Sequence, residues 1–261
     1  MAILDGFKLT SFDHEGSRRD VYRRGSGPAV VVIHEIPGIT PQVAEFGRIV
    51  ADAGFTVAMP DMFGTPGKAL SVPYMVGQLA KACISREFHT LAAHEASPVT
   101  DWLRALCRQI HEETGGPVGA IGMCLTGNFA LALALDPWLM APVLSQPSLP
   151  FAINPARRAG LHISADGLHT LKRRTSEERL RILGMRFDGD PMCPPERFEA
   201  LRQEFGNAFE GIELPASSGN PKGNKPPHSV VTTDLINEEG QPTRQALDRV
   251  ISFFKEQLAP A

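Results

Sequence analysis

Short apolar runs alternate along the chain with longer segments in which apolar residues recur every three or four positions. The short runs predict buried strands at residues 28–33, 55–59, 118–121, 142–146, 181–187 and 209–214. The longer segments predict helices at residues 43–53, 98–111, 128–135, 166–174, 196–205 and 244–258. Residues 7–11 and 19–23 predict an N-terminal hairpin. Strands that alternate with helices indicate an α/β fold with a largely parallel sheet.

Composition narrows the class of protein without identifying it. The 261 residues, 43% of them hydrophobic, suit one α/β domain spanning residues 1–261. A net charge of -3 argues against a nucleic-acid or anionic-membrane partner, and no apolar stretch reaches transmembrane length. Residues 1–6 lack the pattern of a secretion signal, so we expect a cytoplasmic protein. The four cysteines show no metal-binding spacing, and in that compartment disulfides are not expected.

A cysteine between two glycines follows the strand predicted at residues 118–121. The segment Gly122-Met123-Cys124-Leu125-Thr126-Gly127 leads directly into the Ala/Leu-rich helix predicted at residues 128–135. Strand, sharp turn and helix form the elbow on which α/β-hydrolases carry their nucleophile, and the glycines remove side chains that would clash there. Cys124 is therefore a candidate nucleophile. The alternative is a buried cysteine that packs as a small hydrophobe.

A candidate acid and a candidate base follow the elbow in the order typical of α/β-hydrolases. Asp188-Gly189-Asp190-Pro191 comes directly after the strand at 181–187, and His228 follows a turn-rich stretch at 217–227. The histidine would take the thiol proton, and the acid would orient the imidazole. Asp190 is preferred because the prolines around it suggest a rigid loop, whereas Asp beside Gly at 188 is typical of a turn.

Upstream, the strand at 28–33 is followed by His34-Glu35-Ile36-Pro37-Gly38. The loop after this strand supplies an oxyanion donor in α/β-hydrolases. A carboxylate at position 35 is unusual there, because a nearby negative charge raises the pKa of a thiol and discourages the thiolate.

These four segments together resemble the dienelactone hydrolase family: H-E-I-x-G, G-x-C-x-G, G-D-x-x-x-P and H-S-V occur in family order along essentially the whole chain. The resemblance implies an α/β-hydrolase fold with a mostly parallel central sheet, helices on both faces and a cysteine nucleophile elbow. It implies that Glu35 takes the thiol proton when substrate binding reorganises the site. It also implies a catalytic triad of Cys124, Asp190 and His228, with an oxyanion hole formed by the backbone N–H groups of Ile36 and Leu125.

The chain departs from the family pattern in its substrate contacts. Archetypal members hold a substrate carboxylate with two arginines. Arg86 matches the first, but no arginine occurs in the five residues that follow His228, so a bidentate clamp is not expected. Tyr74, in an irregular segment at 63–89, is a candidate to line the pocket, and Thr126 stands where relatives often have Gly and is expected to narrow it.

The sequence thus predicts a hydrolase that cleaves a small ester or lactone through a Cys124 thioester, without a metal or organic cofactor. Its expected partner is the small-molecule substrate, and its expected state is a monomer or small homo-oligomer. One alternative is a catalytically idle α/β-hydrolase fold used for ligand binding or protein interaction. Another is a redox-sensing cysteine, although no resolving cysteine is adjacent to Cys124 in the sequence.

Overall fold

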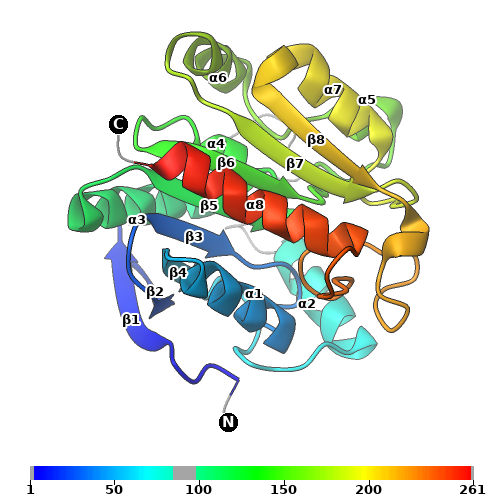
Figure 1. The fold of residues 1–261 in the computed structure, drawn as a ribbon, viewed down its shortest axis with the longest axis horizontal. Coiled ribbons are helices and arrows are strands. Elements are labelled where there is room, and N and C mark those ends of the chain that lie inside the picture. The colour runs from blue at the N-terminus through cyan, green and yellow to red at the C-terminus, as the bar shows by residue number, and fades with distance from the viewer. Residues whose placement is uncertain (1–2, 85–97, 260–261) are drawn as a thin grey trace.

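The computed structural model describes residues 3–84 and 98–259, and its centre is a twisted β-sheet with helices on both faces (Figure 1). Among the described residues the sheet has eight strands in the order β1-β2-β4-β3-β5-β6-β7-β8. Their bounds are β1 Lys8–His14, β2 Ser17–Arg24, β3 Ala29–Ile33, β4 Thr56–Pro60, β5 Val118–Met123, β6 Leu139–Ser145, β7 Ile182–Phe187 and β8 Phe209–Leu214.

Strand direction separates the sheet into two parts. The strands from β4 to β8 run parallel, whereas β1 pairs antiparallel with β2 and β2 pairs antiparallel with β4. The predicted N-terminal hairpin is therefore confirmed as the edge of an otherwise parallel sheet. Because parallel strands end at the same edge, the loops after β3, β5 and β7 meet there, as a doubly wound sheet requires.

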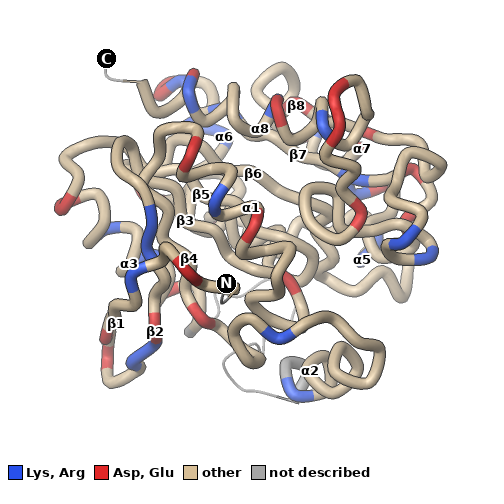
Figure 2. The backbone as a smooth tube through the Cα atoms, turned by 60° about the horizontal axis from the view of Figure 1, so that its bottom comes forward, with Lys and Arg blue, Asp and Glu red and all other residues tan. Residues whose placement is uncertain are grey.

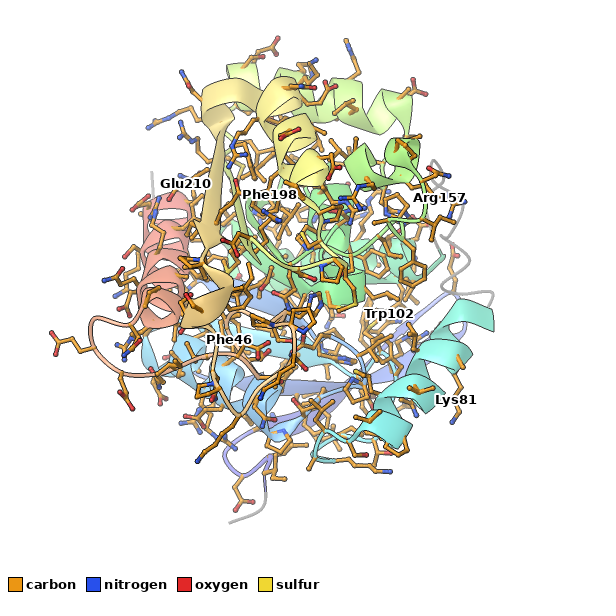
Figure 3. All side chains as sticks on the ribbon, turned by 90° about the vertical axis from the view of Figure 1, so that its right-hand side faces the viewer. Phe46, Lys81, Trp102, Arg157, Phe198 and Glu210 are labelled. Carbon is orange, nitrogen blue, oxygen red and sulfur yellow. The ribbon has the colours of Figure 1, made fainter. Side chains whose placement is uncertain are left out.

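Helices cover both faces of the sheet, so inner strands such as β3, β5 and β7 are buried on both sides and lack polar alternation. On one face, α1 (Pro41–Asp52) and α8 (Pro242–Leu258) pack over a core that includes Phe46 and Phe253. The other face is covered by α3 (Pro98–Thr114), α4 (Phe129–Leu133), α6 (Ala165–Glu177) and α7 (Pro195–Phe205). Trp102 and Phe198 lie in this second core (Figure 3).

Local sequence explains where several helices begin. Thr40 caps α1 by accepting the N–H of Val43 at 3.3 Å, and Pro41 fills the first helical position, where no N–H is needed. Asn154 and Ser164 cap the short α5 (Pro155–Ala159) and α6 in the same way. The segment predicted to be irregular contains α2 (Val72–Ile84), which lies beyond the carboxyl ends of the parallel strands (Figure 1).

Three local expectations need correction. The helix predicted at 128–135 is shorter, because α4 spans only Phe129–Leu133, with Asn128 and Ala134 as its caps. The helix α5 was not predicted. Arg174 ends the basic run Lys172-Arg173-Arg174, a pattern typical of a solvated helix face, yet it is 1% exposed: its guanidinium donates to the carbonyls of Ala134, Asp136, Pro137 and Leu139 and pairs with Glu178.

Charges of both signs are interspersed over the surface (Figure 2). Many form exposed ion pairs, such as Arg108 with Glu112 and Arg244 with Asp248. Pairs of this kind contribute little to stability. In the described part of the chain, none of the helices has the length and apolar character needed to span a bilayer.

Candidate active site

The elbow after β5 holds Cys124 in a strained backbone conformation. Its φ of 54° lies in the left-handed region, which costs a residue with a side chain about 1–3 kcal/mol. A Cβ on Gly122 would lie 2.1 Å from the carbonyl oxygen of Thr126, and one on Gly127 would lie 2.5 Å from Cα of Pro147. Both glycines are therefore required by close backbone approach, as the motif predicts.

Thr126 locks the elbow against the end of β3. Its hydroxyl accepts the N–H of Met123 at 2.9 Å and lies 2.9 Å from the carbonyl oxygen of Ile33, to which it can donate. The side chain is fully buried and does not line the cavity beside Cys124. The expectation that Thr126 narrows the pocket is therefore wrong: the threonine ties two neighbouring strand ends together.

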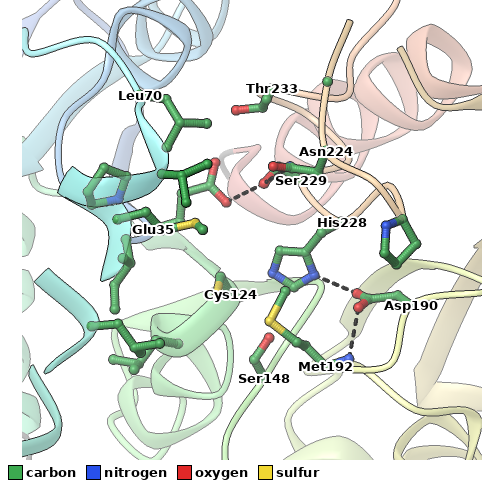
Figure 4. A pocket seen from close by; sticks show the side chains of 18 of the residues that line it. Glu35, Leu70, Cys124, Ser148, Asp190, Met192, Asn224, His228, Ser229 and Thr233 are labelled. Carbon is green, nitrogen blue, oxygen red and sulfur yellow. Dashed lines mark hydrogen bonds and ion pairs between the residues drawn. The ribbon is translucent and has the colours of Figure 1, made fainter. Parts of the chain in front are cut away.

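His228 pairs with Asp190. Nδ1 of His228 lies 2.6 Å from Oδ2 of Asp190, whose Oδ1 accepts the N–H of Met192 at 2.9 Å. The two side chains are buried, and Figure 4 shows the imidazole between Asp190 and Cys124. The other ring nitrogen, Nε2, is buried on the side of Cys124, whose hydrogen bond with the imidazole is among the effects that raise the pKa of His228. This nitrogen is thus available to exchange a proton with a group at Cys124.

The electrostatics of His228 reflect this position between two acidic groups. Burial lowers the pKa of the imidazole, but the charge of Cys124 and the hydrogen bond with Asp190 raise it, and the pKa lies well above its ordinary value. Asp188, the alternative acid, is exposed and accepts the N–H of Ala216 at 2.8 Å. The structure therefore brings Asp190, and not Asp188, to the histidine.

The loop after β3 is held by a buried histidine. Nδ1 of His34 lies 3.1 Å from the carbonyl oxygen of Glu35, and Nε2 accepts the N–H of Met62 at 3.0 Å. An imidazole nitrogen that accepts must be unprotonated, and burial lowers the pKa of His34 to about 4. The neutral ring fixes this loop, and Ile36 follows it into the wall of the cavity beside Cys124.

Glu35 is bound by three polar side chains that the motifs did not reveal. Its Oε2 accepts from the Ser229 hydroxyl at 2.7 Å and from Nε2 of Gln146 at 3.1 Å, and its Oε1 accepts from the Thr232 hydroxyl. The carboxyl group is 4% exposed, and burial raises its pKa. Archetypal family members carry their second carboxylate-binding arginine in the stretch after His228. In this chain that stretch contains Ser229 and Thr232, which contact Glu35 instead.

Asp234 organises the histidine loop, and sequence reasoning missed it as well. Its Oδ2 accepts the backbone N–H groups of His228 at 2.8 Å and of Ser229 at 2.7 Å. The carboxylate also accepts the backbone N–H of Asn224 at 2.6 Å and its side-chain amide at 2.7 Å. Asp234 is fully buried, so these four bonds fix the backbone that carries the base. A polar residue six positions after the candidate base His228 gave no recognisable signal.

A cavity of about 610 Å³ opens beside these groups (Figure 4). Its lining includes Cys124, His228, Asp190, Glu35, Ile36 and Leu125, so the structure brings together the predicted triad, the two expected oxyanion donors and the glutamate.

Tyr74 does not line this cavity. Its hydroxyl accepts the N–H of Thr65 at 2.6 Å and its ring lies under Lys68, which corrects the expected substrate contact. Arg86 lies outside the described residues. Within those residues, no group of three or more His, Cys, Asp or Glu side chains could hold a metal ion.

Comparison with known proteins identifies the relatives of this chain. The profile of the Dienelactone hydrolase family matches residues 21–150. Carboxymethylenebutenolidase 1 from Cupriavidus pinatubonensis (strain JMP 134 / LMG 1197) is 28% identical over 139 residues, covering 51% of this chain and 56% of the relative. Carboxymethylenebutenolidase from Rhodococcus opacus is 29% identical over 110 residues, covering 42% of this chain and 39% of the relative. The matched segments thus span about half or less of these relatives.

Solved structures extend the likeness of fold to nearly the whole chain. A dienelactone hydrolase-like promiscuous phosphotriesterase from metagenomic libraries aligns with a TM-score of 0.63 at 17% identity, covering 97% of this chain and 98% of its own. Dienelactone hydrolase from Anabaena variabilis ATCC 29413 aligns with a TM-score of 0.61 at 12% identity, with coverage of 97% and 98%. The sequence matches thus identify the dienelactone hydrolase family as the one that this chain resembles, and the solved structures show the same fold over nearly the whole chain.

Proposed function

We propose that this protein hydrolyses a carboxylic ester or lactone through a thioester on Cys124. The observation that carries the proposal is the buried His228–Asp190 pair, whose imidazole lines the same cavity as the elbow cysteine and interacts with it. An imidazole held by a carboxylate on one nitrogen and beside a thiol on the other is the arrangement that activates a nucleophile. The family relationship supports the same chemistry.

In the acylation half-reaction, Nε2 of His228 takes the proton of the Cys124 thiol and the sulfur attacks the substrate carbonyl carbon. The carbonyl π-electrons move to oxygen and form a tetrahedral oxyanion. When this collapses, the carbon–oxygen bond to the leaving group breaks, and the imidazolium gives its proton to the departing alkoxide. Asp190 stabilises the imidazolium and keeps Nδ1 as the donor.

In the deacylation half-reaction, His228 takes a proton from water while the water oxygen attacks the thioester carbonyl. The second tetrahedral intermediate expels the Cys124 thiolate, which is reprotonated from the imidazolium, and the carboxylic acid product leaves. The backbone N–H groups of Ile36 and Leu125 are proposed to hold the oxyanion in both steps. A donor of this kind contributes about 2.7–4 kcal/mol to transition-state stabilisation.

The family resemblance implies that Glu35 takes the thiol proton; we propose instead that His228 takes it and that Glu35 opposes thiolate formation until substrate binds. A buried carboxylate near the thiol disfavours a second negative charge. In the unliganded arrangement its oxygens are occupied by Ser229, Thr232 and Gln146. To act on Cys124 directly, the carboxyl group would have to leave these partners, so their hydroxyls set how readily it moves.

The proposal is tested by intact-protein mass spectrometry and steady-state hydrolysis of p-nitrophenyl acetate. The parent should acquire one acetyl group under rapid quench, and peptide mapping should assign it to Cys124. Cys124→Ala should lose both the adduct and turnover while remaining folded. Cys107→Ala is the matched control: this cysteine is 1% exposed, and burial raises the pKa of its thiol. Full turnover by Cys124→Ala would refute the assignment of Cys124 as nucleophile. If the parent showed neither an adduct nor turnover with a range of activated esters, the result would favour a non-catalytic ligand-binding role.

A further inference from the structure

One wall of the active-site cavity is largely apolar. It is formed by α2 and the stretch before it, which contribute Leu70, Val72, Met75 and Leu79, with Ser71 as the one polar side chain among these described lining residues. The lining opposite Cys124 thus comes from a helix that lies outside the sheet layers (Figure 1). Between Val72 and Ile84 the sequence has one charged residue, Lys81, which is exposed and points away from the cavity (Figure 3).

Further apolar side chains line the cavity elsewhere, interspersed with polar ones such as Thr40, Ser148 and Asn224. Ile36, Leu125 and Phe151 line it beside the elbow, and Met192 lines it next to the acid loop. Val72, Leu79 and Met192 are 69%, 37% and 44% exposed, although large apolar side chains are usually buried. Their exposure at a cavity mouth is typical of a surface that an apolar ligand covers.

The charged groups of the cavity offer little to an anionic substituent. Glu35 and Asp190 are acidic and already hydrogen-bonded within the protein. The cations among the described lining residues are Lys222 and Lys225, both exposed on the histidine loop. An ammonium group in water attracts a carboxylate weakly and without the fixed geometry of a guanidinium.

We propose that the non-reacting part of the substrate is an uncharged, apolar group that binds against α2, so that the enzyme selects neutral esters or lactones over those carrying a carboxylate. This inference rests on the proposed ester hydrolysis and concerns only the specificity of the same cavity. Leu79 and Met75 are the side chains that define the selective wall.

Two physical effects set the expected selectivity. Each methylene that leaves water for this wall should improve kcat/KM by about fourfold until the cavity is filled. A carboxylate placed against the same wall would lose hydration without gaining a partner among the residues that the structure describes, which predicts a penalty of at least about tenfold. The two effects act in opposite directions on substrates of similar length.

The test compares p-nitrophenyl acetate, butyrate and hexanoate with the mono-p-nitrophenyl esters of succinate and glutarate. We expect kcat/KM to rise from acetate to hexanoate and to be at least about tenfold higher for butyrate than for the succinate half-ester. Equal rates, or faster hydrolysis of the half-esters, would overturn the proposal. If that anionic preference disappeared in the Lys222→Gln/Lys225→Gln double variant, the carboxylate would be assigned to the histidine loop instead.

A charge placed on the wall provides the second arm. Leu79→Arg puts a guanidinium at the cavity rim and should lower the butyrate-to-succinate ratio of kcat/KM by at least about tenfold. Val76→Arg is the matched control, because Val76 is 56% exposed on the same helix and does not line the cavity. An equal change of the ratio in both variants would show a long-range charge effect and refute the assignment of the wall. If the parent hydrolyses none of the esters and Cys124 is not acylated, the proposed function itself fails.

Discussion

Replacing Asp190 with asparagine removes one oxygen from a carboxylate that uses both. In the parent, one oxygen accepts from Nδ1 of His228 at 2.6 Å and the other accepts the N–H of Met192 at 2.9 Å. The amide has a single acceptor oxygen, so only one of these bonds survives. If the amide oxygen stays with Met192, the amide N–H₂ faces Nδ1 of His228. Nδ1 must then accept a hydrogen bond, so the imidazole carries its proton on Nε2.

The size of the effect follows from that tautomer. With Nε2 protonated, His228 cannot take the thiol proton, and the same exchange in a serine-protease triad lowers kcat about 10⁴-fold. We therefore expect Asp190→Asn to lose about 10³–10⁴ in kcat, which corresponds to about 4–5.5 kcal/mol of transition-state stabilisation. If the amide turns its oxygen to the histidine instead, the N–H of Met192 loses its acceptor, which costs about 1–3 kcal/mol of folding free energy.

The assay measures kcat with p-nitrophenyl butyrate and the free energy of unfolding in urea for the same samples. Asp188→Asn is the matched control two residues away, because that side chain is exposed and accepts a single N–H, from Ala216. It should keep kcat within about twofold and lose less than about 1 kcal/mol of stability. A fully active, normally folded Asp190→Asn would refute the role of the acid, and a larger kcat loss in Asp188→Asn would transfer that role.

Three further predictions test the surroundings of the triad. Glu35→Gln, with the other three cysteines replaced, should speed alkylation of Cys124 by iodoacetamide at pH 7, because a charge that opposes the thiolate is gone; an unchanged or slower rate would contradict this. Asp234→Asn should lower the free energy of unfolding in urea by about 2–3 kcal/mol and reduce kcat, because the new amide N–H₂ would face the N–H of His228. Unchanged stability and kcat would mean that the histidine loop keeps its conformation without the Asp234 carboxylate. The pKa of buried His34 is about 4, against an ordinary 6.5, so the unfolded chain binds this proton first as the pH falls. The contribution of neutral His34 to the free energy of unfolding is therefore complete above pH 6.5 and is lost as the pH falls toward 4. The decrease in unfolding free energy from pH 7.5 to 4.5 should therefore be about 3 kcal/mol smaller in His34→Asn than in the parent, and equal decreases would contradict the assignment.

Local patterns were sufficient wherever neighbouring residues in the chain determine the structure. The apolar run and glycines around Cys124 predict strand, elbow and helix, and the elbow glycines are required by contacts at Thr126 and Pro147. The parallel sheet follows from the alternation of buried strands with amphipathic helices. Even here length was less certain than type, because α4 ends at Leu133 although the Ala/Leu composition continues to Leu135.

The contacts that set the chemistry join residues far apart in the sequence, and only the tertiary structure decides them. Glu35 meets Thr232 across a separation of 197 residues, and His228 meets Asp190 across 38. A hydroxyl or carboxyl side chain has no sequence periodicity that reveals its partner, so the hydroxyl at 232 was not recognised and Asp188 remained an alternative to Asp190.

Burial explains the remaining difference between sequence and structure. Arg174 belongs to a basic run that is typical of a solvated helix, yet it is buried because main-chain carbonyls after α4 converge on its guanidinium. Conversely, Val72 and Leu79 are apolar yet exposed, because α2 lies beyond the strand ends and borders a cavity. The sequence by itself determined which chemical groups are available and in what order. The packing of distant segments decided which of them lose water and find a partner, because desolvation depends on neighbours that only the fold assembles.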